Sequence, residues 1–357
     1  MQTRRGKVLV TGGAGYIGSH TVHRLVECGY GVVVFDNLLQ GHREALPERA
    51  VFVEGDLLDR AAVAALFQLH RFDAVLHLAG NASVGESMAL PFLYLQDNVV
   101  AALNVIRAAV EHAVPKFVFS STCNLFGAAG AVPVTEEEPV LPGSPYGESK
   151  HIIERMLHWA DAVHGLRVGV MRYFNVAGAA LDGSIGEAHD PETHLIPLAI
   201  DAALGRRPAV KIFGTDYPTP DGTCVRDYIH VCDLAEAHMR VLGALDAGSR
   251  CYNVGSGTGH SVLQIVDAVR RVTGREVRTD VAPRRGGDPP VLVASCERVR
   301  RDLDWAPRHS DLDTIIATAW AWRRRHPQGY GHPCARDVRP AETVRLLPLE
   351  AARGLSG

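Results

Sequence analysis

A tyrosine and a lysine that stand four residues apart are the first candidates for chemistry in this chain. They are Tyr146 and Lys150, in the segment SPYGESK. On a helix, residues at this spacing lie on one face, one turn apart, and a nearby ammonium group stabilises a phenolate and lowers the pKa of the tyrosine. The phenol could then take a proton from a substrate hydroxyl while a hydride leaves the same carbon. Thr122, directly after the apolar run at 117–121, could place a second hydroxyl between the tyrosine and the substrate.

A glycine-rich turn near the start of the chain is the second candidate. The segment TGGAGYIG at 11–18 follows a predicted strand and opens a predicted helix. Gly12, Gly15 and Gly18 let the backbone turn tightly and approach a pyrophosphate, and the helix N-terminus offers free N–H groups to phosphates. Glycine-rich turns are common in loops, but the strand-turn-helix context favours a dinucleotide-binding motif.

Acidic residues after the next two predicted strands extend this motif. Asp36 stands eighteen residues after Gly18, where a carboxylate can bind both hydroxyls of an adenosine ribose and repel a 2′-phosphate. This position predicts NAD as the cofactor rather than NADP. Asp56 would contact the adenine in the same arrangement. The alternative for both residues is a solvated aspartate in a turn.

The elements that must position these residues alternate regularly through the first half of the chain. Apolar runs predict buried strands at 8–11, 32–35, 51–54, 74–79, 117–121 and 168–173, and longer patterns predict helices at 17–28, 60–69 and 93–114. Strands that are apolar throughout are typical of a parallel sheet covered by helices on both faces. We therefore predict an α/β fold with a doubly wound, Rossmann-type sheet.

The regular alternation ends after residue 175. Residues 177–192 are rich in Gly, Ala and Asp and have no clear period, and later patterns predict helices at 195–204, 234–245 and 262–273 and a strand at 225–230. We predict an NAD-binding domain at 1–175 that includes the tyrosine-lysine helix, and a smaller mixed α/β region at 176–331 that mainly binds substrate. Residues 332–357 are expected to form a surface tail.

Composition excludes several classes of function. The 357 residues carry a net charge of −3 and no long apolar stretch, which argues against binding to nucleic acid or a membrane. Seven cysteines without C-x-x-C spacing, and an apolar run at the start that is too short for a signal peptide, favour a cytoplasmic protein without disulfides. The seventeen histidines include no H-E-x-x-H motif, and we interpret His20, His23 and His189 as surface or packing residues, so no metal site is expected.

From about residue 7 to residue 330 the chain resembles the extended short-chain dehydrogenase/reductase family, and within it the UDP-glucose 4-epimerase branch. The glycine turn and the tyrosine-lysine pair are shared by the whole family, whereas the later segments are more specific to the branch. The segments that carry the resemblance are VTGGAGYIGSH (10–20), VGES (84–87), SPYG (144–147), RYFN (172–175), DYPT (216–219), VRDYIHV (225–231) and HPQGY (326–330).

The resemblance implies a reaction and a set of roles. Such enzymes oxidise C4 of a nucleotide sugar, let the 4-keto sugar rotate and return the hydride to the opposite face, so that NAD stays bound. Tyr146 would be the general base and acid, Lys150 would tune it and hold the nicotinamide ribose, and Thr122 would relay the proton. A homodimer through helices 93–114 and 146–164 is implied as well. The implied cofactor contacts are Gly12, Gly15, Tyr16, Ile17, Gly18, Asp36, Asn37, Asp56, Leu57, Leu78, Ala79, Gly80, Asn98, Tyr146, Lys150 and Phe174, although Asn98 could equally be a satisfied buried amide.

The resemblance also implies how a UDP-sugar would be held. Arginine suits a diphosphate because its planar fork donates two charge-assisted hydrogen bonds, and Arg226 ranks above Arg285, which could be part of a solvated basic turn. Asp288 would bind the hydroxyls of the uridine ribose. The full implied set of substrate contacts is Thr122, Asn175, His194, Leu195, Lys211, Phe213, Arg226, Arg285 and Asp288.

A few positions depart from the family pattern and leave alternatives open. Phe126 replaces a tyrosine and removes a hydroxyl near the site, Ala82 stands where some relatives carry a lysine, and Leu292 occupies a position linked to acceptance of N-acetylated sugars. The expected reaction is the interconversion of UDP-glucose and UDP-galactose; UDP-N-acetylhexosamines, UDP-glucuronate and UDP-xylose are alternative substrates. A sugar-nucleotide dehydratase or a decarboxylase is disfavoured, because Cys123 and Asn124 replace the acid-base pair that a dehydratase needs. A silent NAD sensor is disfavoured because the tyrosine and lysine are both present.

Overall fold

Seven parallel strands form the main sheet of the computed structural model, which describes residues 5–127, 130–285 and 288–331. The strand order is β10-β6-β5-β4-β1-β2-β3, and each neighbouring pair is parallel. This order confirms the predicted doubly wound fold. The strands are β1 (Lys7–Thr11), β2 (Gly31–Asp36), β3 (Val51–Glu54), β4 (Ala74–His77), β5 (Lys116–Thr122), β6 (Arg167–Tyr173) and β10 (Arg250–Val254).

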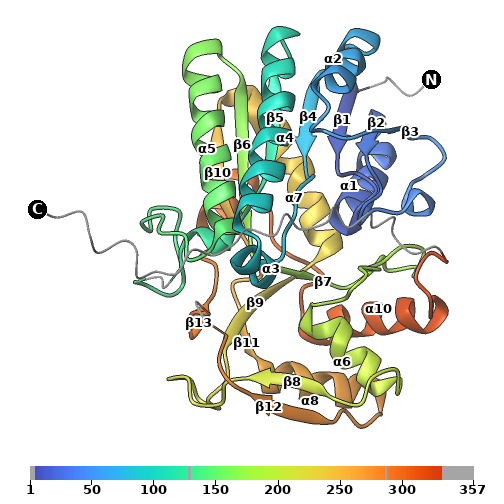
Figure 1. Cartoon of the computed structure of the whole chain (residues 1–357), viewed down its shortest axis with the longest axis vertical. Helices are drawn as coiled ribbons and strands as arrows, with labels where there is room; N and C mark the ends of the chain where they lie inside the picture. Colours follow the sequence, from blue (N-terminus) through green and yellow to red (C-terminus); the bar gives the residue numbers. More distant parts are fainter. Residues whose placement is uncertain (1–4, 128–129, 286–287, 332–357) are drawn as a thin grey trace, which may run out of the picture.

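Helices cover both faces of this sheet (Figure 1). Successive side chains of a strand point to opposite faces, so Val8 and Val10 join one apolar core and Leu9 joins the other. The first core lies under α1 (Tyr16–Glu27) and α7 (Val231–Ala244). The second lies under α2 (Arg60–Leu69), α4 (Pro91–Glu111) and α5 (Pro145–His164). Both faces are therefore buried, as the continuously apolar strands predict.

Local sequence signals set the ends of the helices. The carboxylate of Asp59 accepts hydrogen bonds from the backbone N–H groups of Ala61 and Ala62, so Asp59 is the N-cap of α2. Ser144 caps α5 by accepting from the N–H of Gly147, and Gly165 ends that helix with a left-handed φ of 70°. Within the described part of the chain, no helix combines the length and the apolar character needed to cross a membrane.

The second region is built from two small sheets and three larger helices (Figure 1). Its core is formed by α6, α8 and α10 together with strands β7, β8 and β9. Shorter helices are α3 (Val84–Ala89), α9 (Glu297–Leu303) and the 3-10 turns Arg43–Ala45, Cys123–Leu125 and Leu245–Ala247. The main elements of the region are β7 (Asn175–Ala177), β8 (Val210–Phe213), β9 (Val225–His230), β11 (Gly259–Ser261), β12 (Thr279–Ala282), β13 (Val291–Leu292), α6 (Leu195–Ala203), α8 (Val262–Thr273) and α10 (Leu312–Arg325).

The two regions of the structure are not two consecutive segments of the sequence. After β9 it returns to the main sheet, where α7 covers one face and β10 becomes the strand beside β6. The first region therefore also uses residues beyond 175, a return that the sequence patterns did not predict. The tail predicted at 332–357 lies outside the described residues.

Candidate active site

The predicted cofactor residues follow the carboxyl ends of the parallel strands, at the point where the strand order reverses between β1 and β4. Ligands of doubly wound sheets bind in the crevice at this point. Because all these strand ends meet at one edge of the sheet, residues far apart in sequence are brought together. They are Gly12 to Gly18 after β1, Asp36 and Asn37 at β2, Asp56 and Leu57 after β3, Leu78, Ala79 and Gly80 after β4, Thr122 at the end of β5 and Phe174 after β6.

The glycine turn is packed too tightly for side chains. Gly12 has a φ of +70°, and a Cβ there would lie 2.5 Å from the backbone nitrogen of Ala79. A Cβ on Gly18 would overlap the carbonyl oxygen of Gly12. Gly15 is the N-cap of α1. The turn therefore presents bare backbone and a helix N-terminus toward the crevice, as phosphate binding requires.

Asp36 is held against this turn. Its two carboxylate oxygens accept hydrogen bonds from the N–H groups of Ala14 and Leu38, each at 2.9 Å. The side chain is buried, and burial raises its pKa above the ordinary value in spite of these bonds. Asp56 is also fixed locally, because its Oδ1 accepts from the N–H of Leu58 at 2.8 Å. Asn37 accepts from the N–H of Leu39 at 3.2 Å.

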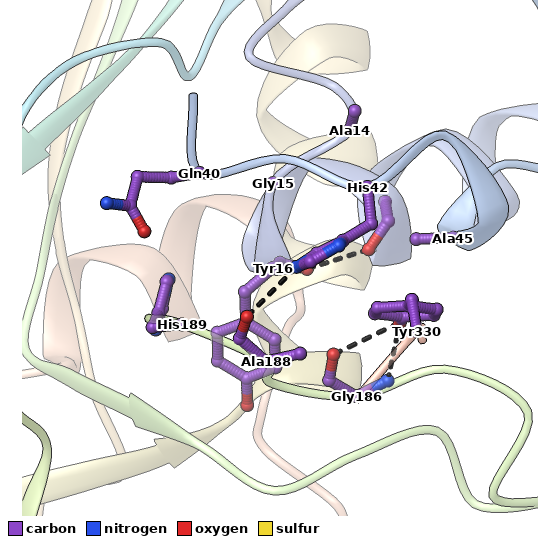
Figure 2. A pocket seen from close by; sticks show the side chains of 11 residues that line it. Ala14, Gly15, Tyr16, Gln40, His42, Ala45, Gly186, Ala188, His189 and Tyr330 are labelled. Carbon is purple, nitrogen blue, oxygen red and sulfur yellow. Dashed lines mark hydrogen bonds between the residues drawn. The ribbon is translucent and has the colours of Figure 1, made fainter. Parts of the chain in front are cut away.

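A pocket opens beside the glycine turn, and a later loop forms its opposite wall (Figure 2). The hydroxyl of Tyr16 donates to the carbonyl of Gly178 at 2.7 Å, so this side chain ties the turn to the loop after β7. His42 contacts the carbonyl of Ala188 at 2.9 Å. The hydroxyl of Tyr330 lies 3.0 Å from the nitrogen and 3.1 Å from the oxygen of Gly186. Segment 186–189 therefore lies directly against the cofactor turn.

Asn98 behaves as a satisfied buried amide. Its Oδ1 accepts from the N–H of Asn81 at 2.8 Å, and its Nδ2 donates to Asn81 O at 3.1 Å and to Ser149 Oγ at 3.0 Å. These bonds fix the turn after β4. The turn lies beside Lys150, since a Cβ built on Gly80 would be 3.0 Å from Asn98 Oδ1 and 3.4 Å from Lys150 Nζ. Asn98 is therefore a satisfied buried amide, and its contact with the cofactor stays a prediction.

The tyrosine, lysine and threonine converge at the end of β5. Lys150 donates from Nζ to the carbonyl of Ser120 at 3.0 Å and lies 6.0 Å from the centre of the Tyr146 ring. The Thr122 hydroxyl, which accepts from Asn124 Nδ2 at 3.0 Å, is close enough to the Tyr146 phenol to lower its pKa. The three groups proposed to handle the proton are thus within reach of one another.

The prediction that the pKa of Tyr146 is lowered is wrong for the protein chain without a cofactor. Burial raises the pKa of Tyr146 to about 12, and the nearby Thr122 hydroxyl only partly opposes it. Burial also lowers the pKa of Lys150 to about 8. Removing both groups from water disfavours the charged form of each. The spacing of the pair correctly indicated their proximity, but it carried no information about this desolvation.

The residues at the dehydratase positions cannot exchange protons near neutral pH. Cys123 is buried, and burial raises the pKa of its thiol to about 12. Asn124 is engaged with Thr122. Phe126 is buried in the core and its ring lies 5.5 Å from the guanidinium of Arg172, so the replaced tyrosine position packs beneath an arginine. Ala82 is exposed.

Strand pairing in the second region collects the predicted substrate residues. Asn175 on β7 lies opposite Tyr228 on β9 in the parallel pairing of these strands. Arg226, also on β9, lies 3.4 Å from the carboxylate of Asp288. The neighbouring residue on β13, Leu292, is buried.

The remaining predicted substrate residues lie on β8 and in the turn before β13. The guanidinium of Arg285 stacks over the ring of Phe213 at 4.0 Å. Lys211 is exposed and stands two residues from Phe213, so both point to the same face of β8. Arg285 is therefore positioned by an aromatic ring rather than being only a solvated turn residue.

His194 is the N-cap residue of α6, directly before Leu195, and lies in an acidic surrounding that the sequence analysis missed. Its Nδ1 is 2.8 Å from Glu187 Oε1 and 3.1 Å from Glu192 Oε1, and His189 Nδ1 is 3.0 Å from the same oxygen of Glu187. Burial lowers the pKa of His194, but Glu187 and then Glu192 outweigh it and hold that pKa well above its usual range. The spacing E-x-H-x-x-E-x-H at 187–194 was the available signal.

His20 and His23, which were predicted to be surface or packing residues, do pack against the backbone. His20 is buried, with Nδ1 2.8 Å from the carbonyl of Tyr16, and burial lowers its pKa to about 4. His23 contacts the carbonyl of Ala45 at 3.1 Å.

Comparison with known proteins agrees with this geometry. The family described as "NAD dependent epimerase/dehydratase family" matches residues 8–255. A UDP-glucose 4-epimerase of Lacticaseibacillus casei is 47% identical over 326 residues, which cover 91% of this chain and 98% of that protein. A crystal structure of a UDP-glucose 4-epimerase is 49% identical and superposes with a TM-score of 0.88 over 91% of this chain and 99% of the other. The enzyme of that name from Bifidobacterium longum, solved with NAD+ and UDP, is 34% identical and superposes with a TM-score of 0.87 over 91% of this chain and 100% of the other. The chain belongs to the NAD dependent epimerase/dehydratase family, and UDP-glucose 4-epimerases are among its near relatives.

Proposed function

We propose that this chain is a UDP-glucose 4-epimerase, an isomerase that interconverts UDP-glucose and UDP-galactose through a 4-keto sugar and uses NAD as its bound cofactor. One observation carries the proposal: Tyr146, Thr122 and Lys150 converge at the same sheet edge as the glycine turn and Asp36. Residues 1–175 would mainly bind NAD and residues 176–331 mainly the UDP-sugar, in a cytoplasmic enzyme.

The residues present fit NAD, and the chain's own groups would manage the proton. The glycine turn would hold the pyrophosphate, Asp36 the adenosine ribose and Lys150 the nicotinamide ribose. When bound, NAD supplies the acceptor and donor of the hydride at C4. Tyr146 takes the proton of the C4 hydroxyl, directly or through Thr122, as the C4–H and O–H bonds are exchanged for a C=O bond. After the keto sugar rotates, Tyr146 returns the proton as the C4–H bond forms on the other face.

Because the pKa of Tyr146 is raised, bound NAD would have a second role, which is to favour ionisation of the phenol. A phenol with a pKa of about 12 is a poor base near neutral pH. Lys150 and the glycine turn would hold oxidised NAD near Tyr146, and its positive charge would favour the phenolate and lower the pKa of Tyr146. The base would therefore become active only when the oxidised cofactor is in place.

Arg226 is the proposed anchor for the diphosphate. We expect Arg226→Lys to raise the KM for UDP-galactose by roughly tenfold or more and to change kcat by less than about threefold, because a lysine keeps the charge but loses the planar fork. Steady-state kinetics would measure both parameters. Arg284→Lys is the matched control, since Arg284 stacks over Tyr217 at 4.2 Å and pairs with Asp216 instead. An unchanged KM in Arg226→Lys would remove this residue from the diphosphate site.

The substrate itself is tested with purified protein and no added cofactor. UDP-galactose, UDP-N-acetylgalactosamine, UDP-glucuronate and UDP-xylose are each incubated with the enzyme, and the products are separated by chromatography. We expect conversion of UDP-galactose to UDP-glucose with the highest kcat/KM of the four. Conversion of another sugar in its place would overturn the assignment of substrate and keep the reaction.

We also propose a homodimer formed by α4 and α5, which pack side by side on one face of the main sheet (Figure 1). Phe92 and Leu103, eleven residues and about three helical turns apart on α4, expose large apolar side chains. Trp159 and Val163 do the same at adjacent turns of α5. Exposed apolar surface of this kind marks a protein interface.

A charge in this face should break the dimer. Trp159→Glu is expected to give a monomer at micromolar concentration, because the interface would have to bury a carboxylate without a partner. Light scattering measures the mass. Leu69→Glu changes another exposed apolar residue, at the end of α2, and should leave the dimer intact. A wild-type protein that is monomeric, or a dimeric Trp159→Glu variant, would contradict the proposed interface.

A further inference from the structure

Four metal-ligating side chains meet in the loop that leads into α6. Glu187, His189, Glu192 and His194 each offer one ligand atom, and these four atoms lie within 4.8 Å of one another. The two carboxylates are largely removed from water, with side chains that are 6% and 8% exposed. The glycine turn and the tyrosine-lysine pair do not use this cluster, and only His194 is shared with the substrate contacts that the resemblance implies.

We propose that Glu187, His189, Glu192 and His194 bind a single divalent transition-metal ion, with zinc as the best fit. Two imidazole nitrogens and two carboxylate oxygens are a donor set that zinc accepts, whereas magnesium and calcium prefer oxygen ligands. Four protein ligands would leave no open position, which is typical of a structural rather than a catalytic zinc. The proposal goes beyond the epimerase reaction and does not depend on it.

The separations of the donor atoms suit a small tetrahedral ion. Bonds of about 2.0–2.1 Å to a tetrahedral zinc place neighbouring ligand atoms roughly 3.3 Å apart. Three of the observed separations are 2.8 Å and 3.1 Å from His194 Nδ1 to Glu187 and Glu192, and 3.0 Å from His189 Nδ1 to Glu187. Small shifts of the side chains would therefore complete the site.

An unpartnered oxygen is the second observation. The Oε1 of Glu192 accepts from the backbone N–H groups of Thr193 and His194, but its buried Oε2 has no hydrogen-bond partner among the described residues. A buried carboxylate oxygen without a partner is costly. A cation bound by the Glu192 carboxylate, through either oxygen, would offset this cost by neutralising the charge of the buried group.

The charge around the cluster also favours a cation. Arg323 Nη1 lies 3.8 Å from Glu192 Oε2, and the Nε and Nη2 of that arginine bind the carboxylate of Asp201, so one guanidinium is shared between two carboxylates. Two buried carboxylates then remain beside two imidazole rings. A divalent ion would balance them with the rings neutral; without one, the balance needs both rings to be protonated, and this ion-pair network is the alternative that the experiment must separate.

The location gives the ion a mechanical role. His189 packs edge-on against Tyr16 of the cofactor turn, with 6.2 Å between ring centres, and Figure 2 shows it in the wall of that pocket. His194 directly precedes Leu195, the first residue of α6. Trp322 Nε1 of α10 donates to the carbonyl of Glu187 at 3.1 Å. An ion held by the cluster would therefore fasten the loop between the cofactor turn and α6.

The test uses the full chain without a polyhistidine tag. The protein is stripped with a chelator, dialysed and titrated with Zn²⁺ or Co²⁺, and bound metal is counted by mass spectrometry after gel filtration. We expect about one ion per chain, a rise in the thermal midpoint of roughly 5 °C at 100 times the Kd, and the visible absorption of tetrahedral Co²⁺.

Variants separate this site from adventitious binding. The double variant His189→Gln/Glu192→Gln should bind zinc roughly 100-fold more weakly or worse and lose the cobalt absorption. His112→Gln, which changes an exposed histidine at the end of α4, should bind like the wild type. Equal zinc binding by the double variant and the wild type would overturn the proposal. If the double variant does not fold, the wild type decides alone: no stoichiometric zinc and no tetrahedral cobalt spectrum would establish the ion-pair network instead.

Discussion

Tyr146→Phe is expected to lower kcat by about a thousandfold while the purified protein keeps its NAD. Loss of a positioned general acid-base costs on the order of 10²–10⁴ in rate. The phenyl ring preserves the edge-on packing against Tyr94, with ring centres 6.4 Å apart, so the fold should be unaffected. Turnover of UDP-galactose and the NAD content released on denaturation are the two measurements.

A second buried phenol provides the control for Tyr146→Phe. Tyr252 lies in β10, and its hydroxyl is 3.5 Å from the carboxylate of Asp302, away from the sheet edge that carries the site. Tyr252→Phe should change kcat by less than about twofold, because it removes only one long, partly buried hydrogen bond away from the site. Near-normal turnover by Tyr146→Phe would remove Tyr146 from its proposed role.

Gly18→Ala has the second large expected effect, and it acts on the cofactor. An added Cβ would overlap the carbonyl oxygen of Gly12 and lie 2.8 Å from the Cα of Gly13, so the turn must move. Overpacking of this kind costs about 1–3 kcal/mol, which corresponds to roughly a 5- to 150-fold loss of NAD affinity if the strain falls on the NAD-bound state. The variant should be purified with little NAD and regain activity only when NAD is added in excess.

Gly243 in α7 is the matched control, because a Cβ at this helical position would meet no atom within 4 Å. Gly243→Ala should keep its NAD and gain up to about 1 kcal/mol of stability from the better helix propensity of alanine. A Gly18→Ala protein that retains stoichiometric NAD would show that the turn does not contact the cofactor as proposed.

In the main sheet, six of the seven strands were predicted from the sequence, and β10 was missed. The six continuously apolar strands are identifiable because both of their faces are buried. Strand β10 reads Arg250-Cys251-Tyr252-Asn253-Val254 and lies at the edge of the sheet. Its buried Asn253 is tolerated because Nδ2 donates to the carbonyl of Val134 at 2.9 Å, a partner 119 residues away. A contact of this kind leaves no local pattern.

Some features of the candidate site could likewise be predicted from the sequence, and others could not. The glycine turn and Asp36 were predictable because their function depends on local backbone geometry after a strand. The direction of the Tyr146 pKa shift was not, since it is set by burial that arises only in the packed chain. The cluster around Glu187 and His194 was missed because it lies in an irregular loop, where no helical period brings its residues to one face.

In the proposed reaction, C4 of the sugar is oxidised and then reduced within the site, and Tyr146 transfers only the proton of the hydroxyl group. The most direct test converts UDP-galactose in D₂O with purified protein and no added cofactor, and measures the hydrogen at C4 of the product by NMR. We expect UDP-glucose that carries the original hydrogen at C4, because the hydride removed from carbon is returned to carbon without exchange with solvent. Deuterium at C4 would indicate proton exchange at carbon and contradict the mechanism, and the absence of any conversion would contradict the proposed function itself.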